Sequence, residues 1–322
     1  MKPFTKLLGI IALVVVVIIS VFAIQNRQQI YDSIILRGYT PSENVKQLAD
    51  NTTMTDRTRR VFYVNRPEID DKDRFKGVCK TTEQSIVLGC YVENDGIFLL
   101  DVKDQRLSGV MEVTSAHEVL HAEYDRLNKT QREEVDKMTA NFFATIKDDR
   151  IKKTIENYRK KDPSVVPNEL HSILGSEVRD LTPELEAHYA EYFTNRKAVV
   201  AYSEQYEQVF TDLKNEQDRY VARLDQIKAD FNTKLEQLNA LETQRAQFKA
   251  ELDSLRGQDK INEYNSRVDS YNALVVQRNA LIPSLKALSS ESEDVVNKYN
   301  NSIVLYQGLI QAIDANSVPK SL

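Results

Sequence analysis

The stretch "TSAHEVLHAEYDRL", residues 114–127, contains two of the chain's four histidines, four residues apart, with a glutamate directly after the first. On a helix, residues four apart lie on one face, so His117 and His121 can direct their imidazoles at a single point. Zinc needs about 2.0–2.1 Å to each nitrogen, and this spacing supplies that geometry. Glu118 projects beside the pair and can reach a metal-bound water, as a general base does in metal-assisted hydrolysis. The stretch predicts a helix that binds Zn²⁺ and carries a catalytic glutamate.

The alternative is an ordinary amphipathic helix that happens to contain this motif. Ser115 and Glu118 could form a capping box, with the histidines at the surface and Val119 and Leu120 facing inward. These apolar residues would seat the helix in a core under either interpretation. With four histidines in 322 residues, a chance match is rare, which favours the zinc site.

A catalytic zinc takes three protein ligands and leaves one position for water, so a third ligand must come from elsewhere in the chain. The candidates are Glu169, His171, Glu177 and Glu186. Glu177 lies about two helical turns beyond Glu169 on roughly the same face. It could therefore be the ligand itself, or a partner that hydrogen-bonds His117 or His121. His171 is turned roughly 200° from Glu169, which favours a structural or substrate-facing role.

Three apolar segments before the motif are typical of strands. They are residues 59–69, "RRVFYVNRPEI", residues 84–92, "QSIVLGCYV", and residues 96–102, "GIFLLDV". The "ENDG" segment, residues 93–96, predicts a turn between the last two. We expect a small sheet, antiparallel in part, followed by helices, which makes the fold class α+β and mostly helical.

The helices expected after the motif cover residues 128–147, 168–181 and 182–196. In the last of these, Thr182 can cap the helix and Pro183 suits its first position. Tyr189 and Tyr192 in this segment are candidates for stabilising an oxyanion. We expect His188 to pack or to cap a helix.

The two cysteines, Cys79 and Cys90, predict a disulfide, because an isolated pair outside the cytoplasm usually forms one. Such a bridge would stabilise the fold by roughly 2–3 kcal/mol. A metal-binding pair is the alternative, but the spacing lacks the CxxC pattern.

The N-terminus predicts a membrane anchor. "MKPFTK" carries two lysines and no acid, and Leu7–Ile24 then runs without a charge, just long enough to cross a bilayer. The positive-inside rule places the N-terminus in the cytoplasm and most of the chain outside it. A signal peptide cleaved after Val21–Ala23 is the alternative. We favour the uncleaved anchor of residues 1–27, because the apolar run is longer than a usual signal core.

Residues 197–322 predict a long coiled-coil hairpin. Apolar residues follow a 3-4 repeat before and after "RGQD", residues 256–259, which breaks the pattern. Two arms around a turn favour an antiparallel hairpin, although pairing between chains is also open. Pro283 should kink or interrupt the second arm. We expect this region to serve spacing, self-association or docking of a protein partner. The net charge of −5 gives no basic excess, so nucleic acid is not an expected partner.

An H-E-x-x-H motif followed on a later helix by a ligand glutamate resembles the gluzincin metallopeptidases. "NELHS", residues 168–172, is similar to the N-E-x-x-S segment of thermolysin-like enzymes, where a small residue lets two helices pack closely. The resemblance implies Glu169 as the third ligand, with Glu177 as the alternative. The sequence departs from those enzymes at Ile173, where they carry an aspartate that hydrogen-bonds a zinc-bound histidine.

Residues 39–196 also resemble an uncharacterised group of bacterial membrane-anchored metallopeptidases, through "LGCY", "TSAHEVLHA" and "NELHSILGSEV". The resemblance implies a zincin-like domain at residues 28–196, in which a peptide or protein substrate adds to an edge strand, "GIFLLDV". The expected function is that of an extracytoplasmic zinc endopeptidase. The alternative is a non-enzymatic envelope scaffold that acts through its coiled coil.

Overall fold

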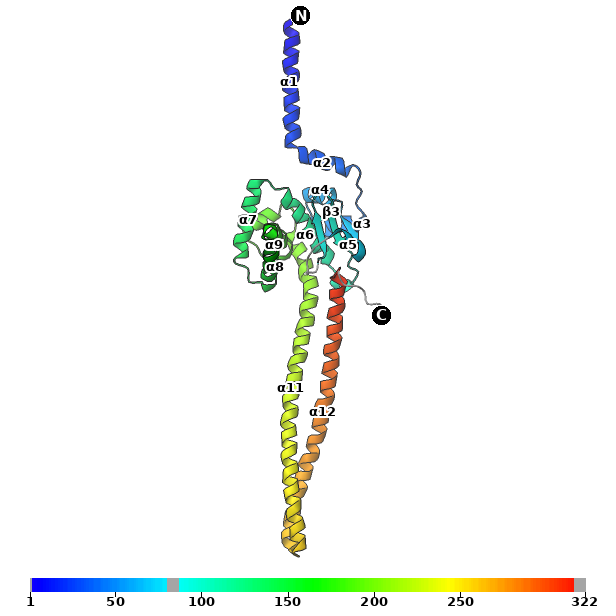
Figure 1. The fold of residues 1–322 in the computed structure, drawn as a ribbon, viewed down its shortest axis with the longest axis vertical. Helices are drawn as coiled ribbons and strands as arrows, with labels where there is room; N and C mark the ends of the chain where they lie inside the picture. The colour runs from blue at the N-terminus through cyan, green and yellow to red at the C-terminus, as the bar shows by residue number, and fades with distance from the viewer. Residues whose placement is uncertain (1, 80–86, 316–322) are drawn as a thin grey trace. The chain divides into compact units, whose positions relative to one another are not determined.

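The computed structural model describes residues 2–79 and 87–315, with side chains described from residue 13 onward (Figure 1). The chain divides into two compact units. One comprises residues 1–209 and 309–322, and the other comprises residues 210–308. The described residues are mostly helical and contain one three-stranded sheet, which confirms the predicted α+β class.

The helices of the folded domain in the first unit are short to medium in length. They are α3 (Glu43–Asn51), α4 (Asp56–Val64), α5 (Lys72–Val78), α6 (Val110–Asp125), α7 (Lys129–Phe143), α8 (Asp149–Lys161), α9 (Val166–Glu177) and α10 (Pro183–Tyr189), with 3₁₀ turns at Gln105–Leu107 and Pro163–Val165. The predicted cap at Thr182 is confirmed, because its side chain accepts a hydrogen bond from the backbone N–H of Leu185.

The sheet has the order β1-β3-β2, with β1 at Glu68–Asp70, β2 at Gly89–Val92 and β3 at Gly96–Leu100. β2 runs antiparallel to β3 and β1 runs parallel to it. The predicted turn at residues 93–96 is confirmed. All five residues of β3 are buried. The prediction that "GIFLLDV" forms the edge strand is wrong, because β3 is central and β2 lies at the edge.

The strand predicted at residues 59–69 is mostly wrong, because α4 occupies its first half. The side chain of Thr55 accepts from the backbone N–H of Thr58 and caps this helix. Thr58, Val61 and Phe62 are buried on one helical face. The cap and the 3.6-residue spacing outweigh the β-branched and aromatic composition, since propensity yields to packing. Only β1 follows, after Pro67.

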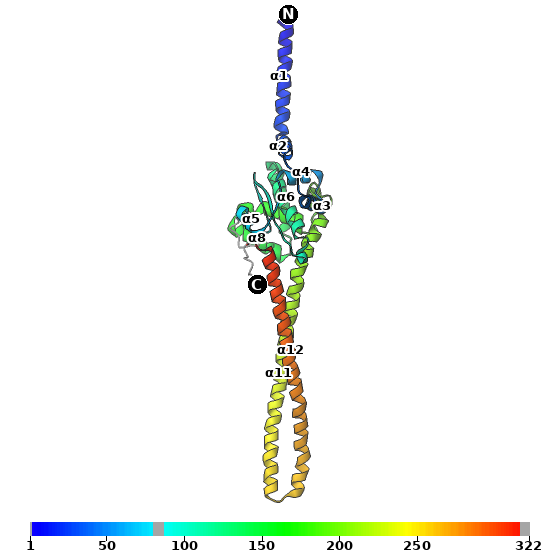
Figure 2. The ribbon, with the colours of Figure 1, turned by 90° about the vertical axis from the view of Figure 1, so that its right-hand side faces the viewer.

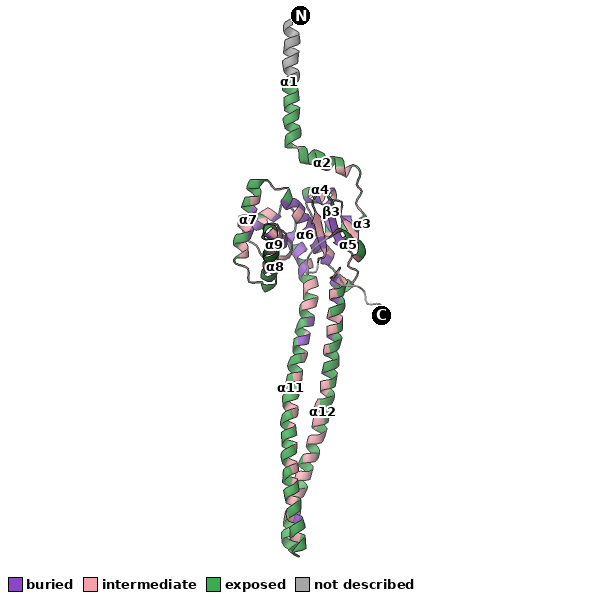
Figure 3. Cartoon of the chain, viewed as in Figure 1, coloured by how far each residue is buried: buried purple, intermediate pink, exposed green. Residues whose placement is uncertain are grey.

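The buried core of this unit surrounds α6, as the purple segments of Figure 3 show. α6 packs against α3, α4, α9, β2 and β3. Gly175 allows the close approach of α9, because a Cβ there would lie 2.5 Å from Leu120 and 2.6 Å from Tyr189. The motif helix is therefore the centre of the domain, and α9 lies directly against it.

The N-terminal residues form α1 (Lys2–Gln25) and α2 (Arg27–Leu36). Residues 7–12 of the predicted membrane span lie outside the described side chains. From Leu13 onward, no single described helix is long and apolar enough to cross a membrane. Leu13–Gln25 and Arg27–Leu36, bent by 70° at their junction, meet the length and composition criteria together.

The second unit is an antiparallel pair formed by the parts of α11 (Arg196–Gly257) and α12 (Ile261–Ile313) that lie within residues 210–308, and these run side by side in Figures 1 and 2. Ion pairs join the arms in antiparallel register, at Arg223–Glu291 and Arg267–Glu251. The predicted break at residues 256–259 is confirmed. Pro283 does not interrupt the second arm, because α12 continues through this residue; the alternative of a kink there stays a prediction. The loss of one backbone donor does not end so long a helix.

Candidate metal centre

His117 and His121 lie in the middle of α6, and their Nε2 atoms are 3.1 Å apart. The helix begins at Val110, well before the motif. The hydroxyl of Ser115 donates to the backbone oxygen of Glu112. The alternative of a capping box that begins at Ser115 is therefore wrong. The two imidazoles point at one location, as the i,i+4 spacing predicts.

Glu169, in the first turn of α9, brings a carboxylate to the same location. Its oxygens lie 3.7 Å from Nε2 of His117 and 3.9 Å from Nε2 of His121. One donor atom from each of the three residues lies within 4.8 Å of the others. Two ligands of a tetrahedral zinc ion are about 3.3 Å apart. These three donors therefore fit a single metal ion after small adjustments.

A buried oxygen of Glu169 supports a cation at this position. Its Oε2 is buried and has no hydrogen-bond partner. Leaving a buried charged oxygen without a partner is costly, so native proteins rarely do it. This oxygen lies nearest to the paired imidazoles, where a metal ion would satisfy it. The residues present therefore fit a divalent ion.

The other ring nitrogens of the two histidines face separate acceptors. Nδ1 of His121 lies 2.9 Å from Oδ1 of Asn168, and Nδ1 of His117 lies 4.0 Å from Oε1 of Glu177. An acceptor at Nδ1 keeps the proton there and leaves the Nε2 lone pair for a metal. Asn168 is therefore placed to fix the orientation of the His121 imidazole. Ile173 stands at the position of the aspartate in thermolysin-like enzymes and is buried and apolar.

Glu177 lies on the Nδ1 side of His117, away from the three converging donors. Its Oε2 is 2.7 Å from Nη1 of Arg150, whose Nη2 is 3.0 Å from Glu207 at the start of α11. Glu177 therefore lies apart from the three converging donors, on the Nδ1 side of His117. Its role as an orienting partner of His117 stays a prediction.

Glu118 is buried, with 5% of its surface exposed. Burial and the negative charge of Glu169 raise the pKa of its carboxyl. His117 and the backbone N–H of Tyr91 lower this pKa, and the resulting value is about 7. A carboxyl with this pKa can both accept and release a proton near neutral pH. The sequence predicted its role but not its burial.

The pKa values of the two histidines are shifted in opposite directions. Burial lowers the pKa of His117, but contact with Glu169 and the charges of Glu118 and Glu177 raise it to about 9. Burial and the neighbouring His117 lower the pKa of His121. Two lone pairs 3.1 Å apart repel unless a cation lies between them. A proton or a metal ion between the two nitrogens would relieve this repulsion, and the two would compete for the same position.

Edge strand β2 packs directly against the side chain of Glu118. A Cβ at Gly89 would lie 2.9 Å from Oε1 of Glu118 and 2.5 Å from Cγ2 of Thr114. Only glycine lets the backbone approach α6 this closely. Gly89 was not predicted as a functional residue, although its place in "LGCY" beside a strand was a usable signal.

His117, His121 and Glu169 line a cavity of ≈ 860 Å³. Its lining comes from β2, α6, α7, α8, α9 and the start of α11, and includes Tyr91, Tyr124, Arg150, Tyr158, Asn168 and Tyr206. Tyr158 on α8 hydrogen-bonds the Glu169 carboxylate. The site therefore has room for a ligand and a tyrosine hydroxyl beside the donors.

Five other residues singled out in the sequence lie away from this cavity. Tyr189 and Tyr192 are fully buried, and the hydroxyl of Tyr189 donates to the backbone oxygen of His171. The prediction that these tyrosines stabilise an oxyanion is wrong. His171 is buried against His188, with 3.0 Å between their Nε2 atoms, which confirms packing roles for both. Glu186 pairs with Arg196 and is not a third ligand.

The predicted disulfide between Cys79 and Cys90 is confirmed. It joins the end of α5 to β2, the strand that crosses Glu118. The alternative of a metal-binding cysteine pair is wrong. The bridge therefore fixes the edge strand beside the candidate metal centre.

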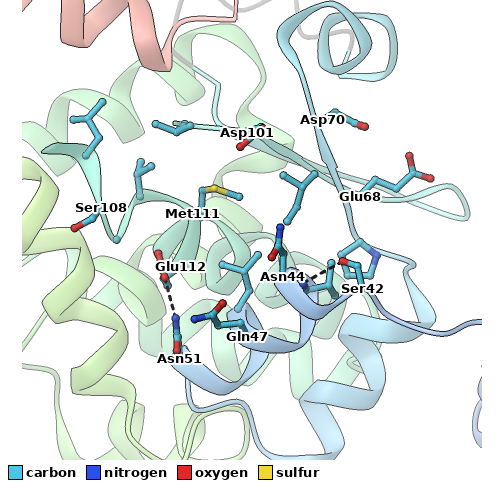
Figure 4. Close-up of a pocket in the computed structure, with 18 of the residues that line it drawn as sticks. Ser42, Asn44, Gln47, Asn51, Glu68, Asp70, Asp101, Ser108, Met111 and Glu112 are labelled. Atoms are coloured by element: carbon cyan, nitrogen blue, oxygen red, sulfur yellow. Dashed lines mark hydrogen bonds between the residues drawn. The ribbon is translucent and has the colours of Figure 1, made fainter. Parts of the chain in front are cut away.

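A second cavity, of ≈ 720 Å³, lies between α3, β1 and the start of α6 (Figure 4). Its acidic lining residues are Glu68, Asp70, Asp101 and Glu112. Glu112 accepts a hydrogen bond of 3.0 Å from Asn51, drawn as a dashed line in Figure 4. Among the residues that the structure describes, only His117, His121 and Glu169 bring three donors together. We therefore place the metal chemistry in the first cavity.

Comparison with family models, curated proteins and solved structures found no match to this chain.

Proposed function

We propose that this chain is a zinc-dependent endopeptidase of zincin-like fold. The observation that carries the proposal is the convergence of His117, His121 and Glu169 beside a buried Glu118. Three protein ligands with an open cavity are typical of a catalytic zinc site, whereas structural sites are closed by four ligands. The likeness of the sequence to gluzincins agrees with this ligand set.

In this proposal, His117, His121 and Glu169 hold the ion. When bound, zinc supplies Lewis acidity that polarises a carbonyl and lowers the pKa of a bound water. Glu118 accepts the proton of the attacking water and passes it to the leaving amine, which its pKa of about 7 permits. Asn168 orients His121 through Nδ1. The Tyr158 hydroxyl lies in the cavity beside Glu169, where it can donate to the carbonyl oxygen of a substrate.

Strand β2 supports a peptide as the substrate. The backbone N–H of Leu100 donates to the oxygen of Leu88, so alternate residues of β2 pair with β3. Gly89 and Tyr91 then turn their backbone groups away from the sheet, where the N–H of Tyr91 contacts the carboxylate of Glu118. The remaining backbone groups of this edge can pair with an extended peptide beside Glu118. We therefore expect a peptide or protein segment that binds in an extended conformation.

We further propose that α1 anchors the chain in a membrane, with the N-terminus in the cytoplasm and the domain outside it. The two lysines before the apolar run and the Cys79–Cys90 disulfide support this orientation. The paired arms of α11 and α12 would form a coiled coil. Exposed apolar residues on this pair, such as Val276 and Val304, favour a role in docking a protein partner.

The test is metal analysis and peptide cleavage with the purified full-length protein and its Glu118→Gln variant. We expect about one zinc per chain in both, with cleavage lost only in the variant. Glu112→Gln is a matched control, because Glu112 is on the same helix but faces the second cavity. Wild-type protein that contains no zinc would refute the proposal. Zinc with no cleavage by either protein would favour the scaffold alternative, and equal cleavage by both would contradict the role of Glu118.

A further inference from the structure

Helix α2 has its apolar side chains on the outside. Ile30, Tyr31 and Ile34 are 41%, 53% and 61% exposed. At about 100° per residue they fall within one arc of roughly 100°. Asp32, on the opposite side, is only 3% exposed. This is the reverse of a surface helix in a soluble domain, which turns its charged face to water.

The polar side of α2 is held by the folded domain. Both oxygens of Asp32 contact the guanidinium of Arg126, at 2.8 and 3.1 Å. Arg60 of α4 donates to the backbone oxygen of Gln29 at 3.3 Å, while Gln28 donates to Asp32 within α2 at 3.2 Å. Arg126 is the residue at which α6 ends. α2 is thereby tied to the helix that carries the metal-binding histidines.

The neighbouring chain indicates what covers the apolar side. α2 follows α1, whose apolar side chains from Leu13 to Ile24 are exposed. The exposed Arg27 and Arg37 flank it. Apolar and aromatic side chains between arginines are typical of a helix at the boundary between lipid headgroups and acyl chains. α2 is not part of a broken span, because Asp32 is engaged by Arg126 of the folded domain.

We infer that the face formed by Ile30, Tyr31 and Ile34 inserts into the surface of a lipid bilayer. The inference depends on the proposed membrane anchor but not on the proposed peptidase activity. Arg126 lies about 8 Å beyond His121 along the helix axis. Membrane binding through α2 therefore sets the height of the metal centre above the bilayer.

The chain contains no tryptophan, so Tyr31→Trp introduces a single fluorescent reporter. The full-length variant is reconstituted into vesicles of phosphatidylcholine and phosphatidylglycerol that carry brominated acyl chains. We expect bromine near the headgroups to remove most of the emission, bromine at the bilayer centre to remove less, and aqueous iodide to have little effect. Val276→Trp, at a 68% exposed apolar position of α12, is the control and should respond only to iodide.

Iodide quenching of Tyr31→Trp equal to that of the control would overturn the inference, since the face would then be in water. Emission protected from both quenchers would also overturn it, because a protein would then cover the face. Adding Ile30→Ser and Ile34→Ser to the reporter should weaken quenching by bromine. Zinc content measured on the same samples separates the two proposals, because lipid contact without zinc would reject only the peptidase.

Discussion

At the scale of single residues, Asn168 has the most informative position. It precedes Glu169 in sequence and hydrogen-bonds His121, so one helical turn supplies both a metal ligand and the group that orients another ligand. We predict that Asn168→Ala lowers zinc affinity about 10–100-fold while the domain stays folded. Competition with a chelator measures this. Asn44→Ala in the second cavity is the control, and equal losses in both variants would argue against an orienting role.

The protonation state of the Glu118 carboxyl should determine how cleavage depends on pH. Its pKa of about 7 is raised by burial, and only the deprotonated form can accept a proton. kcat/KM should therefore rise with pH through about 7 and fall tenfold per pH unit below it. A pH profile measured with zinc in excess checks this prediction. A rate independent of pH between about 5 and 8 would contradict a general base with a pKa of about 7.

At the scale of elements, the contact between β2 and α6 determines the position of the edge strand. Gly89→Ala places a methyl group 2.5 Å from Thr114 and 2.9 Å from Glu118. We expect a loss of about 1–3 kcal/mol in the free energy of unfolding, together with reduced cleavage. Gly77→Ala is the control, because nothing lies within 4 Å of a Cβ there. Thermal unfolding and cleavage assays compare the two; unchanged cleavage in Gly89→Ala would contradict this role of β2.

Elements with a local signal were predictable from the sequence. The i,i+4 histidines, the cap at Thr182 and the turn at residues 93–96 each depend on neighbouring residues alone. The strand order β1-β3-β2 depends on contacts between distant segments, so the central position of β3 was missed. The placement of Glu169 and Glu177 required the packing of α9 on α6, which spacing along one helix cannot supply.

At the scale of the whole molecule, all the residues of the candidate metal centre belong to the first unit. The hairpin was predictable because its apolar repeat is long and regular. We predict that removing residues 235–282 and rejoining the arms by a short turn leaves zinc content and cleavage unchanged. Metal analysis and cleavage assays of the shortened full-length chain test this. Loss of zinc would mean that the distal hairpin is needed for the site.

The most direct test of the account is a crystal structure of the zinc-loaded protein, with anomalous diffraction recorded at the zinc absorption edge. We predict one peak about 2.0–2.1 Å from Nε2 of His117, Nε2 of His121 and a carboxylate oxygen of Glu169, with the fourth position facing the cavity. Glu177 should remain on the Nδ1 side of His117. No peak between the imidazoles, or a peak that Glu177 or a fourth side chain ligates, would contradict the account.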